Sequence, residues 1–160
     1  MRSKIFYITV LVALAFTGTS DVANYRKLYL ESVEKPASAE TLLSSTQSAT
    51  EAIGKAYCGA AWALKAKHGN NPIKKLEHLK TGLTKLNDAV VSDAINVEIR
   101  FLRFSVEENI PSLVSFTSHI DDDKKMIIGA LLPSHPFYST IKSYMLKSKK
   151  LNASEKGKIR

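Results

Sequence analysis

The chain has 160 residues, one cysteine and a formal net charge of +8. This length suits one domain with a substantial hydrophobic core, and a lone cysteine excludes an internal disulfide, so the fold must be stabilised by core burial. The positive charge keeps the chain soluble or attracts an anionic partner, and it carries no information about the fold.

Residues 1–20 have the pattern of a secretory signal peptide. Two basic residues give a positive start, an apolar run follows from Ile5 to Phe16, and small residues end the segment. This order predicts cleavage before Asp21, which lowers the net charge from +8 to +6. The apolar run has 12 residues, whereas a membrane-spanning helix needs about 20, so a retained anchor is the weaker alternative. We expect an exported protein, periplasmic or secreted, without a transmembrane span after cleavage.

Apolar residues recur at helical spacing through most of residues 21–150, and no stretch shows the alternation of a strand. We predict a single all-α domain of about six helices in antiparallel hairpins, arranged as a bundle or a repeat-like array. The expected connections have about two to six residues, as helical bundles have.

The first expected helix starts near Val22 and ends before Pro36, which fits the first position of a short second helix. Ser48 and Glu51 fit a capping box at the start of the third helix. Gly69 fits its end. These signals predict three helices in the first half of the chain.

The third expected helix is rich in small residues. Gly54 and Gly59 each weaken an isolated helix by about 1 kcal/mol relative to alanine. Their presence therefore predicts that another helix packs closely against this one. Cys58 lies among small residues and is expected to be buried, while Trp62 is expected in the core or at an interface.

Asn71 followed by Pro72 is the clearest helix start, because it places an N-cap residue before a proline at the first helical position. The helix that follows is amphipathic, with this apolar stripe: Ile73, Leu76, Leu79, Leu83, Leu86 and Val90. Asn96 fits the cap of a further helix that is apolar on more than one face, so this helix should lie at the centre of the domain.

Two arginines in that central helix, Arg100 and Arg103, need either an exit to solvent or an acidic partner. The nearest acids in the sequence are Glu98, Glu107 and Glu108. Because an unpaired charge is costly to bury, one of these acids is the expected partner if the arginines are buried.

The last part of the chain predicts three more helical segments. Pro111 is expected to open a helix, and Asp121–Asp123 suit the positive end of the next one. Ser134-His135-Pro136 is expected to begin the last long helix. Asn152 and Glu155 fit the caps of one short final turn.

From Gly82 to Leu102 the chain resembles the second half of a tetratricopeptide repeat and the start of the next one. Gly82, Leu86, Ala89 and Ala94 match the small, large, alanine and proline positions of that repeat, with Ala94 in place of the proline. The resemblance implies repeat-like helical hairpins. The whole chain also resembles small exported helical proteins of unknown function from Gram-negative bacteria, which implies no activity.

His119 with Asp121–Asp123 is the one cluster with metal-ligand chemistry. Its spacing does not match a calcium-binding loop, so acidic residues at a helix start are the favoured interpretation. Cys58 lacks the local signature of a cysteine enzyme, and no common catalytic or nucleotide-binding motif occurs. We therefore predict no enzymatic activity, no catalytic residue, no cofactor and no metal.

The C-terminal end is basic, with one acid, Glu155, among these residues: Lys142, Lys147, Lys149, Lys150, Lys156, Lys158 and Arg160. Residues 151–160 are expected to form a tail after the domain. A solvated end is the favoured interpretation. Weak binding to an anionic surface, reduced by salt, is the alternative.

The favoured function is a non-catalytic module that binds an unknown protein or peptide. Its groove would be formed by the helices over Ser48–Gly69 and Pro72–Val91. Two alternatives stay open: an envelope-associated enzyme or metal-dependent hydrolase that uses His119 and Asp121–Asp123, and a basic protein that binds anionic surfaces. Nucleic acid is not an expected partner of an exported protein.

Overall fold

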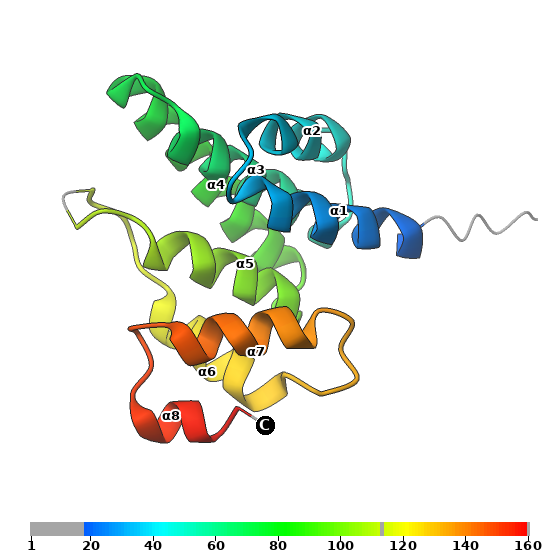
Figure 1. The fold of residues 1–160 in the computed structure, drawn as a ribbon, viewed down its shortest axis with the longest axis vertical. Coiled ribbons are helices and arrows are strands. Elements are labelled where there is room, and N and C mark those ends of the chain that lie inside the picture. The colour runs from blue at the N-terminus through cyan, green and yellow to red at the C-terminus, as the bar shows by residue number, and fades with distance from the viewer. Residues whose placement is uncertain (1–17, 113, 160) are drawn as a thin grey trace, which may run out of the picture.

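A computed structural model describes residues 18–112 and 114–159, so residues 1–17 of the predicted signal peptide lie outside the described part. Within these ranges the chain forms eight α-helices and no β-strand, which confirms the all-α prediction with more helices than the expected six (Figure 1). The helices are α1 (Gly18–Ser32), α2 (Pro36–Thr46), α3 (Ala52–His68), α4 (Pro72–Ser92), α5 (Val97–Glu108), α6 (Ile120–Ala130), α7 (Tyr138–Lys147) and α8 (Ala153–Gly157).

Helices α3 and α4 form a tightly packed antiparallel hairpin. A Cβ atom placed on Gly82 of α4 would lie 2.6 Å from the carbonyl oxygen of Gly59 in α3, and one on Gly59 would lie 2.8 Å from the carbonyl oxygen of Gly82. Real Cβ atoms do not come so near backbone oxygens. The close approach of another helix is therefore confirmed at Gly59, and α4 is the helix that approaches. A Cβ on Gly54 would instead meet Ala49 and Glu51, which precede α3.

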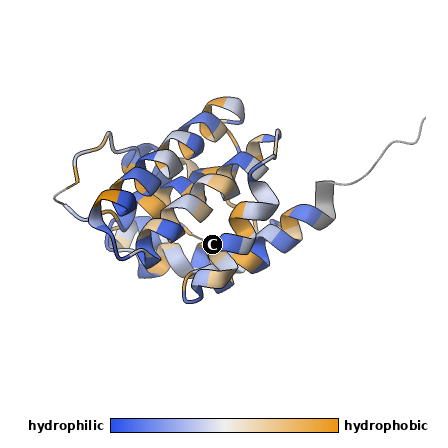
Figure 2. Ribbon diagram, turned by 90° about the horizontal axis from the view of Figure 1, so that it is seen from above, coloured by the Kyte–Doolittle hydropathy of each residue, from blue (hydrophilic) through white to orange (hydrophobic). Residues whose placement is uncertain are grey.

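Helix α5 lies at the centre of the molecule, as its apolar residues predict. Ile99, Phe101, Leu102 and Phe104 are all 0% exposed. Phe101 makes edge contacts with rings from α1 and α7 and with Phe137 before α7. Figure 2 shows hydrophobic and hydrophilic residues interspersed along the helices. Helices α3, α4 and α6 pack against α5.

The partner of the two central arginines is Asp123 of α6, and not one of the three glutamates expected. Arg103 donates through Nε and Nη2 to Asp123 at 2.8 and 2.7 Å, and Arg100 adds a contact of 2.9 Å. The three glutamates instead bind groups outside α5: Glu98 binds Arg26, Glu107 binds the His119 segment, and Glu108 accepts from Ser148. The prediction that the arginines pair with a glutamate of the same helix is therefore wrong.

Three predicted helix starts are wrong. No helix begins at Pro111, and residues 111–112 and 114–119 are not helical, because the serines and β-branched residues of this segment have low helix propensity. Helix α3 begins at Ala52 with Glu51 as N-cap and no side-chain cap, so the capping box is absent. Helix α7 begins at Tyr138, since the preceding His135 closes a turn by accepting from the Phe137 N–H at 3.1 Å.

The C-terminal end packs against the domain. Asn152 and Glu155 form the predicted capping box of α8, with bonds of 2.8 and 2.9 Å. Leu151 and Ile159 on either side of α8 are only 5% and 7% exposed. The expectation of a solvated tail is therefore wrong for these apolar residues, although Lys158 beside them is exposed.

None of the helices in residues 18–112 and 114–159 combines the length and the apolar character needed to cross a bilayer.

Candidate functional site

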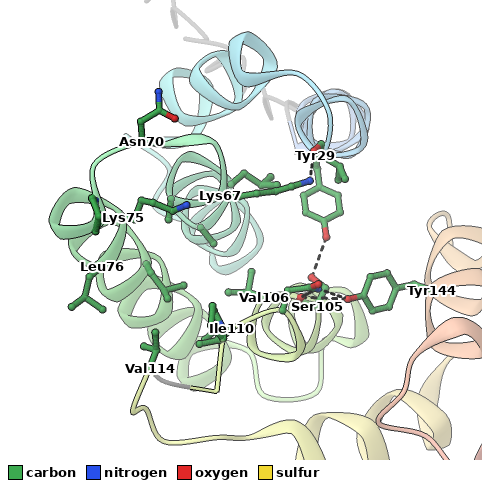
Figure 3. Close-up of a pocket in the computed structure, with 18 residues that line it drawn as sticks. Tyr29, Lys67, Asn70, Lys75, Leu76, Ser105, Val106, Ile110, Val114 and Tyr144 are labelled. Atoms are coloured by element: carbon green, nitrogen blue, oxygen red, sulfur yellow. Dashed lines mark hydrogen bonds between the residues drawn. The ribbon is translucent and has the colours of Figure 1, made fainter.

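A cavity of about 830 Å³ lies between the α3–α4 hairpin and the C-terminal end of α5 (Figure 3). Residues from α1, from the loop that follows α5 and from α7 complete its walls. Lys67, Asn70 and Lys75 are exposed residues of the lining, and we call these three residues the rim. Its volume falls in the range of about 300–1,000 Å³ that is usual for ligand sites.

The walls of the cavity are mainly apolar. They include Leu64, Leu76, Leu79, Val106, Ile110 and Val114. The apolar stripe of α4 explains how one helix serves two purposes. Leu76 and Leu79, one turn apart near its start, line the cavity, whereas Leu86 further along is 0% exposed in the core. The N-terminal end of α4 thus presents to the cavity the same kind of side chain that its C-terminal end buries.

The floor of the cavity is formed by Tyr29, Ser105 and Tyr144, whose polar groups are bonded within the protein (Figure 3). Tyr29 donates to Ser105 Oγ at 3.0 Å, because Ser105 Oγ itself donates to the Leu102 carbonyl at 2.9 Å. Tyr144 accepts from Asn109 Nδ2 at 2.8 Å. Burial raises the pKa of both tyrosines, so the floor is neutral.

The rim carries positive charge. Lys67 donates through Nζ to the carbonyl oxygen of Val33 at the end of α1. The backbone N–H of Lys75 donates to the Asn71 carbonyl at 2.9 Å, whereas its side-chain ammonium has no hydrogen bond or ion pair with any residue in the described part of the chain. No aspartate or glutamate lines the cavity. The cavity therefore combines an apolar interior and a neutral floor with two ammonium groups at its opening.

The structure does not bring His119 and Asp121–Asp123 together. The His119 ring and backbone bind Glu107 at 2.8 and 2.6 Å, whereas Asp123 is 0% exposed between the two arginines of α5. Asp121 pairs with Lys124 at 3.1 Å on the surface, and Asp122 is exposed. Within residues 18–112 and 114–159 no three His, Cys, Asp or Glu side chains are arranged to hold a metal ion.

The other residues singled out in the sequence lie apart from one another. Cys58 is 2% exposed, as expected for a buried thiol. His68 Nε2 lies 2.7 Å from the carbonyl oxygen of Ser32, which ends α1. The His78 ring packs against Trp62, with centroids 5.1 Å apart. Each of these contacts joins one helix to another, and none of them faces the cavity.

A buried polar cluster around Glu98 was not predicted from the sequence. Its carboxylate accepts from both Arg26 Nε and Nη2, at 2.9 and 2.7 Å, and from Tyr57 at 2.5 Å. Burial and the Glu98 charge raise the pKa of Tyr57, which keeps the proton that it donates. His135 Nε2 lies 3.6 Å from the same carboxylate. The groups come from four separate segments, so no local pattern reveals them.

Comparison of the chain with protein-family models, curated proteins and solved structures gives no match. The resemblances to tetratricopeptide repeats and to small exported proteins therefore stay predictions, and the cavity is interpreted from its own geometry.

Proposed function

We propose that the protein is an exported, non-catalytic binding module and that the cavity between α3, α4 and α5 binds a segment of a protein or peptide partner. The observation that supports this most is the apolar cavity of about 830 Å³ with an open rim. The sequence predicts a groove between two helices that correspond to α3 and α4. Both helices line the cavity, and α5 and the following loop add the opposite wall.

The chemistry of the lining supports binding without catalysis. General acid–base catalysis most often uses histidine or a carboxylate, and none of the residues that line the cavity is His, Asp, Glu or Cys. The hydroxyl groups of the floor are already bonded to one another and to the backbone. The lining therefore offers shape and apolar contact rather than an activated nucleophile.

The apolar surface around the opening supports a partner larger than the cavity. Leu76 lines the cavity and is still 39% exposed, and Ile73, one turn before it, is 71% exposed. The two side chains continue the apolar lining onto the outer face of α4. Apolar side chains on a larger molecule would cover this surface, whereas a ligand enclosed in the cavity would leave it in water.

Export is compatible with the position of α1 in the core. Tyr25 is the first α1 residue, counting from Asp21, whose side chain is buried. A cut before Asp21 would thus keep three α1 residues that hold the helix in place. Tyr25 bonds to α2, Arg26 bonds to α5, and Tyr29 bonds to α5 and packs against Tyr57 of α3. The predicted cleavage keeps the buried side chains of Tyr25 and Tyr29 in α1.

The proposal is tested by placing a photo-crosslinking amino acid at Leu76 in the chain as its own cells export it. Val91, 84% exposed at the other end of α4, is the matched control position. We expect one discrete crosslinked partner from position 76 and none from position 91. The intact mass of the recovered protein should correspond to a chain that begins at Asp21. Equal crosslinking from both positions, or none from position 76, would contradict the binding site. A retained Met1 would contradict export.

A further inference from the structure

We propose that the segment bound in the cavity is acidic and amphipathic, with apolar side chains that fill the cavity and adjoining Asp or Glu side chains that pair with Lys67 and with Lys75. This inference rests on the proposed function and specifies the chemistry of the partner. The inference follows from the positions of charged groups, hydrogen-bonded groups and apolar side chains around the cavity.

The charge at the rim selects a carboxylate. Lys67 and Lys75 both line the cavity, and no acidic side chain lines it with them. A lysine ammonium has three N–H donors. Lys67 uses one of them on the Val33 carbonyl, and Lys75 uses none within residues 18–112 and 114–159. A carboxylate beside either ammonium group would therefore find free charged donors, which make the stronger class of hydrogen bond.

The floor fixes the orientation of the segment. The Tyr29 proton is donated to Ser105 Oγ, and the Tyr144 proton points to the Ser105 carbonyl oxygen at 3.4 Å. The floor thus has no free donor for an anion, and burying an unpaired carboxylate there would be costly. The apolar end of the segment must lie against the floor, with its charge near Lys67 and Lys75, which Figure 3 shows extending from α3 and α4.

The apolar walls supply the attraction for the inner end of the segment. Leu64, Leu79 and Val106 present aliphatic side chains from three different helices. Leu76 and the exposed Ile73 extend this surface beyond the opening. A fatty acid would share the apolar chain and the carboxylate, but it would leave this outer surface uncovered. The continuous apolar surface favours a peptide segment, which carries side chains both inside and outside the cavity.

The inference is tested with random peptides displayed on phage and selected against the protein from Asp21 to Arg160. We expect the selected peptides to carry Asp or Glu next to Leu, Ile or Phe. Against a double variant, Lys67→Glu with Lys75→Glu, the selected peptides should carry Lys or Arg at the acidic positions. The matched control is Lys80→Glu with Lys125→Glu, which changes the net charge equally at two exposed lysines outside the cavity and should select acidic peptides as the native chain does.

A selected acidic peptide should bind the Lys67→Glu, Lys75→Glu variant about tenfold or more weakly than the control variant in fluorescence anisotropy. Circular dichroism checks that both variants are folded. Peptides without acidic enrichment, no selected peptide, or equal binding to both variants would overturn the inference. So would a fluorescent long-chain fatty acid that binds when no peptide does, which would assign the cavity to a lipid. Crosslinking at Leu76 tells the two proposals apart: a crosslinked partner without acidic selectivity overturns this inference alone.

Discussion

Three buried carboxylates, Glu98, Glu107 and Asp123, connect α5 to other parts of the chain. Each is at most 2% exposed and binds a partner from another segment: Arg26 for Glu98, the His119 segment for Glu107, and the arginines of α5 for Asp123 of α6. Buried charges persist when they are paired and fully hydrogen-bonded, and removing one partner leaves the other uncompensated. These pairs fix which face of α5 meets which neighbour.

His135 should make the stability of the protein depend on pH. Burial lowers the pKa of His135 below its usual 6.5, although nearby Glu98 acts in the opposite direction. The geometry agrees, because His135 Nδ1 accepts from the Phe137 N–H and protonation would destroy that bond. The unfolded chain therefore takes up the proton first as pH falls. Stability should drop as pH falls below about 6.5 and level off below the folded pKa.

The His135→Gln variant should lose part of this pH dependence. Urea unfolding followed by circular dichroism, measured from pH 7 to pH 5 at constant ionic strength, gives the free energy of unfolding at each pH. We expect a shallower slope for the variant than for the native chain over this window. An unchanged slope would mean that His135 does not contribute to it.

The sequence predicts that the two arginines of α5 need a partner when they are buried, but it does not identify that partner. The sequence predicts that Arg100 and Arg103 either reach solvent or bind an acid, because burying an unpaired charge is costly. The acid that binds them, Asp123, lies 20 residues beyond Arg103 in the sequence. Only the packing of α6 against α5 brings it close. The Glu98 cluster was missed for the same reason.

At the scale of elements, the crossing of α3 and α4 depends on two residues without side chains. Gly82→Ala would place Cβ 2.6 Å from the carbonyl oxygen of Gly59, and a backbone oxygen cannot move without moving its helix. We expect a loss of at least about 1–3 kcal/mol in the free energy of unfolding. Urea unfolding of the two chains measures the difference.

Gly129 in α6 is the matched control, because a Cβ there would meet no atom within 4 Å. Gly129→Ala should raise the free energy of unfolding by up to about 1 kcal/mol, since alanine favours the helix. Opposite signs for the two glycine substitutions are the expected result. A stabilised Gly82→Ala variant would show that the helices separate without cost.

Helix starts were predictable where the cap is local. Asn71, Asn96 and Asn152 each accept from backbone N–H groups within the next three residues, so the sequence contains the whole interaction. Pro111 was misleading because proline permits a helix start without supplying the residues that continue one. The predicted Ser48–Glu51 box failed in a similar way: the spacing is correct, but the helix begins later, at Ala52.

At the scale of the whole molecule, both ends of the described chain contribute to the core around α5. Tyr29 from α1 binds Ser105, and Leu151 and Ile159 are buried at the other end. A chain that stops after Lys150 loses these last two apolar side chains. We expect its free energy of unfolding to fall by about 3–6 kcal/mol, because burying each such side chain contributes about 1.5–3 kcal/mol.

Urea unfolding of the truncated chain tests this prediction. Lys158→Ala is the control, because it removes an exposed charge from the same segment without touching a buried residue. The control should stay within about 0.5 kcal/mol of the native chain. An equally stable truncated chain would show that the C-terminal segment does not stabilise the fold.

The overall fold class could be predicted because helical spacing is a property of neighbouring residues. The cavity could be predicted only in part. Its α3 and α4 walls belong to helices expected to form a groove, but Tyr29, Val106 and Tyr144 reach it from segments far apart in the sequence. Which of their faces meet is decided by packing and not by local pattern.

The two ends of α4 have different roles, and this difference affects which sequence changes the protein can tolerate. Its first two turns, with Leu76 and Leu79, face the cavity, whereas Leu86 and Val90 hold the helix in place from further along. Under the proposed binding function, substitutions in the first group would change which partner binds, whereas the second group would keep the fold intact. Substitutions at the N-terminal end of α4 can thus change the proposed binding specificity without destabilising the fold.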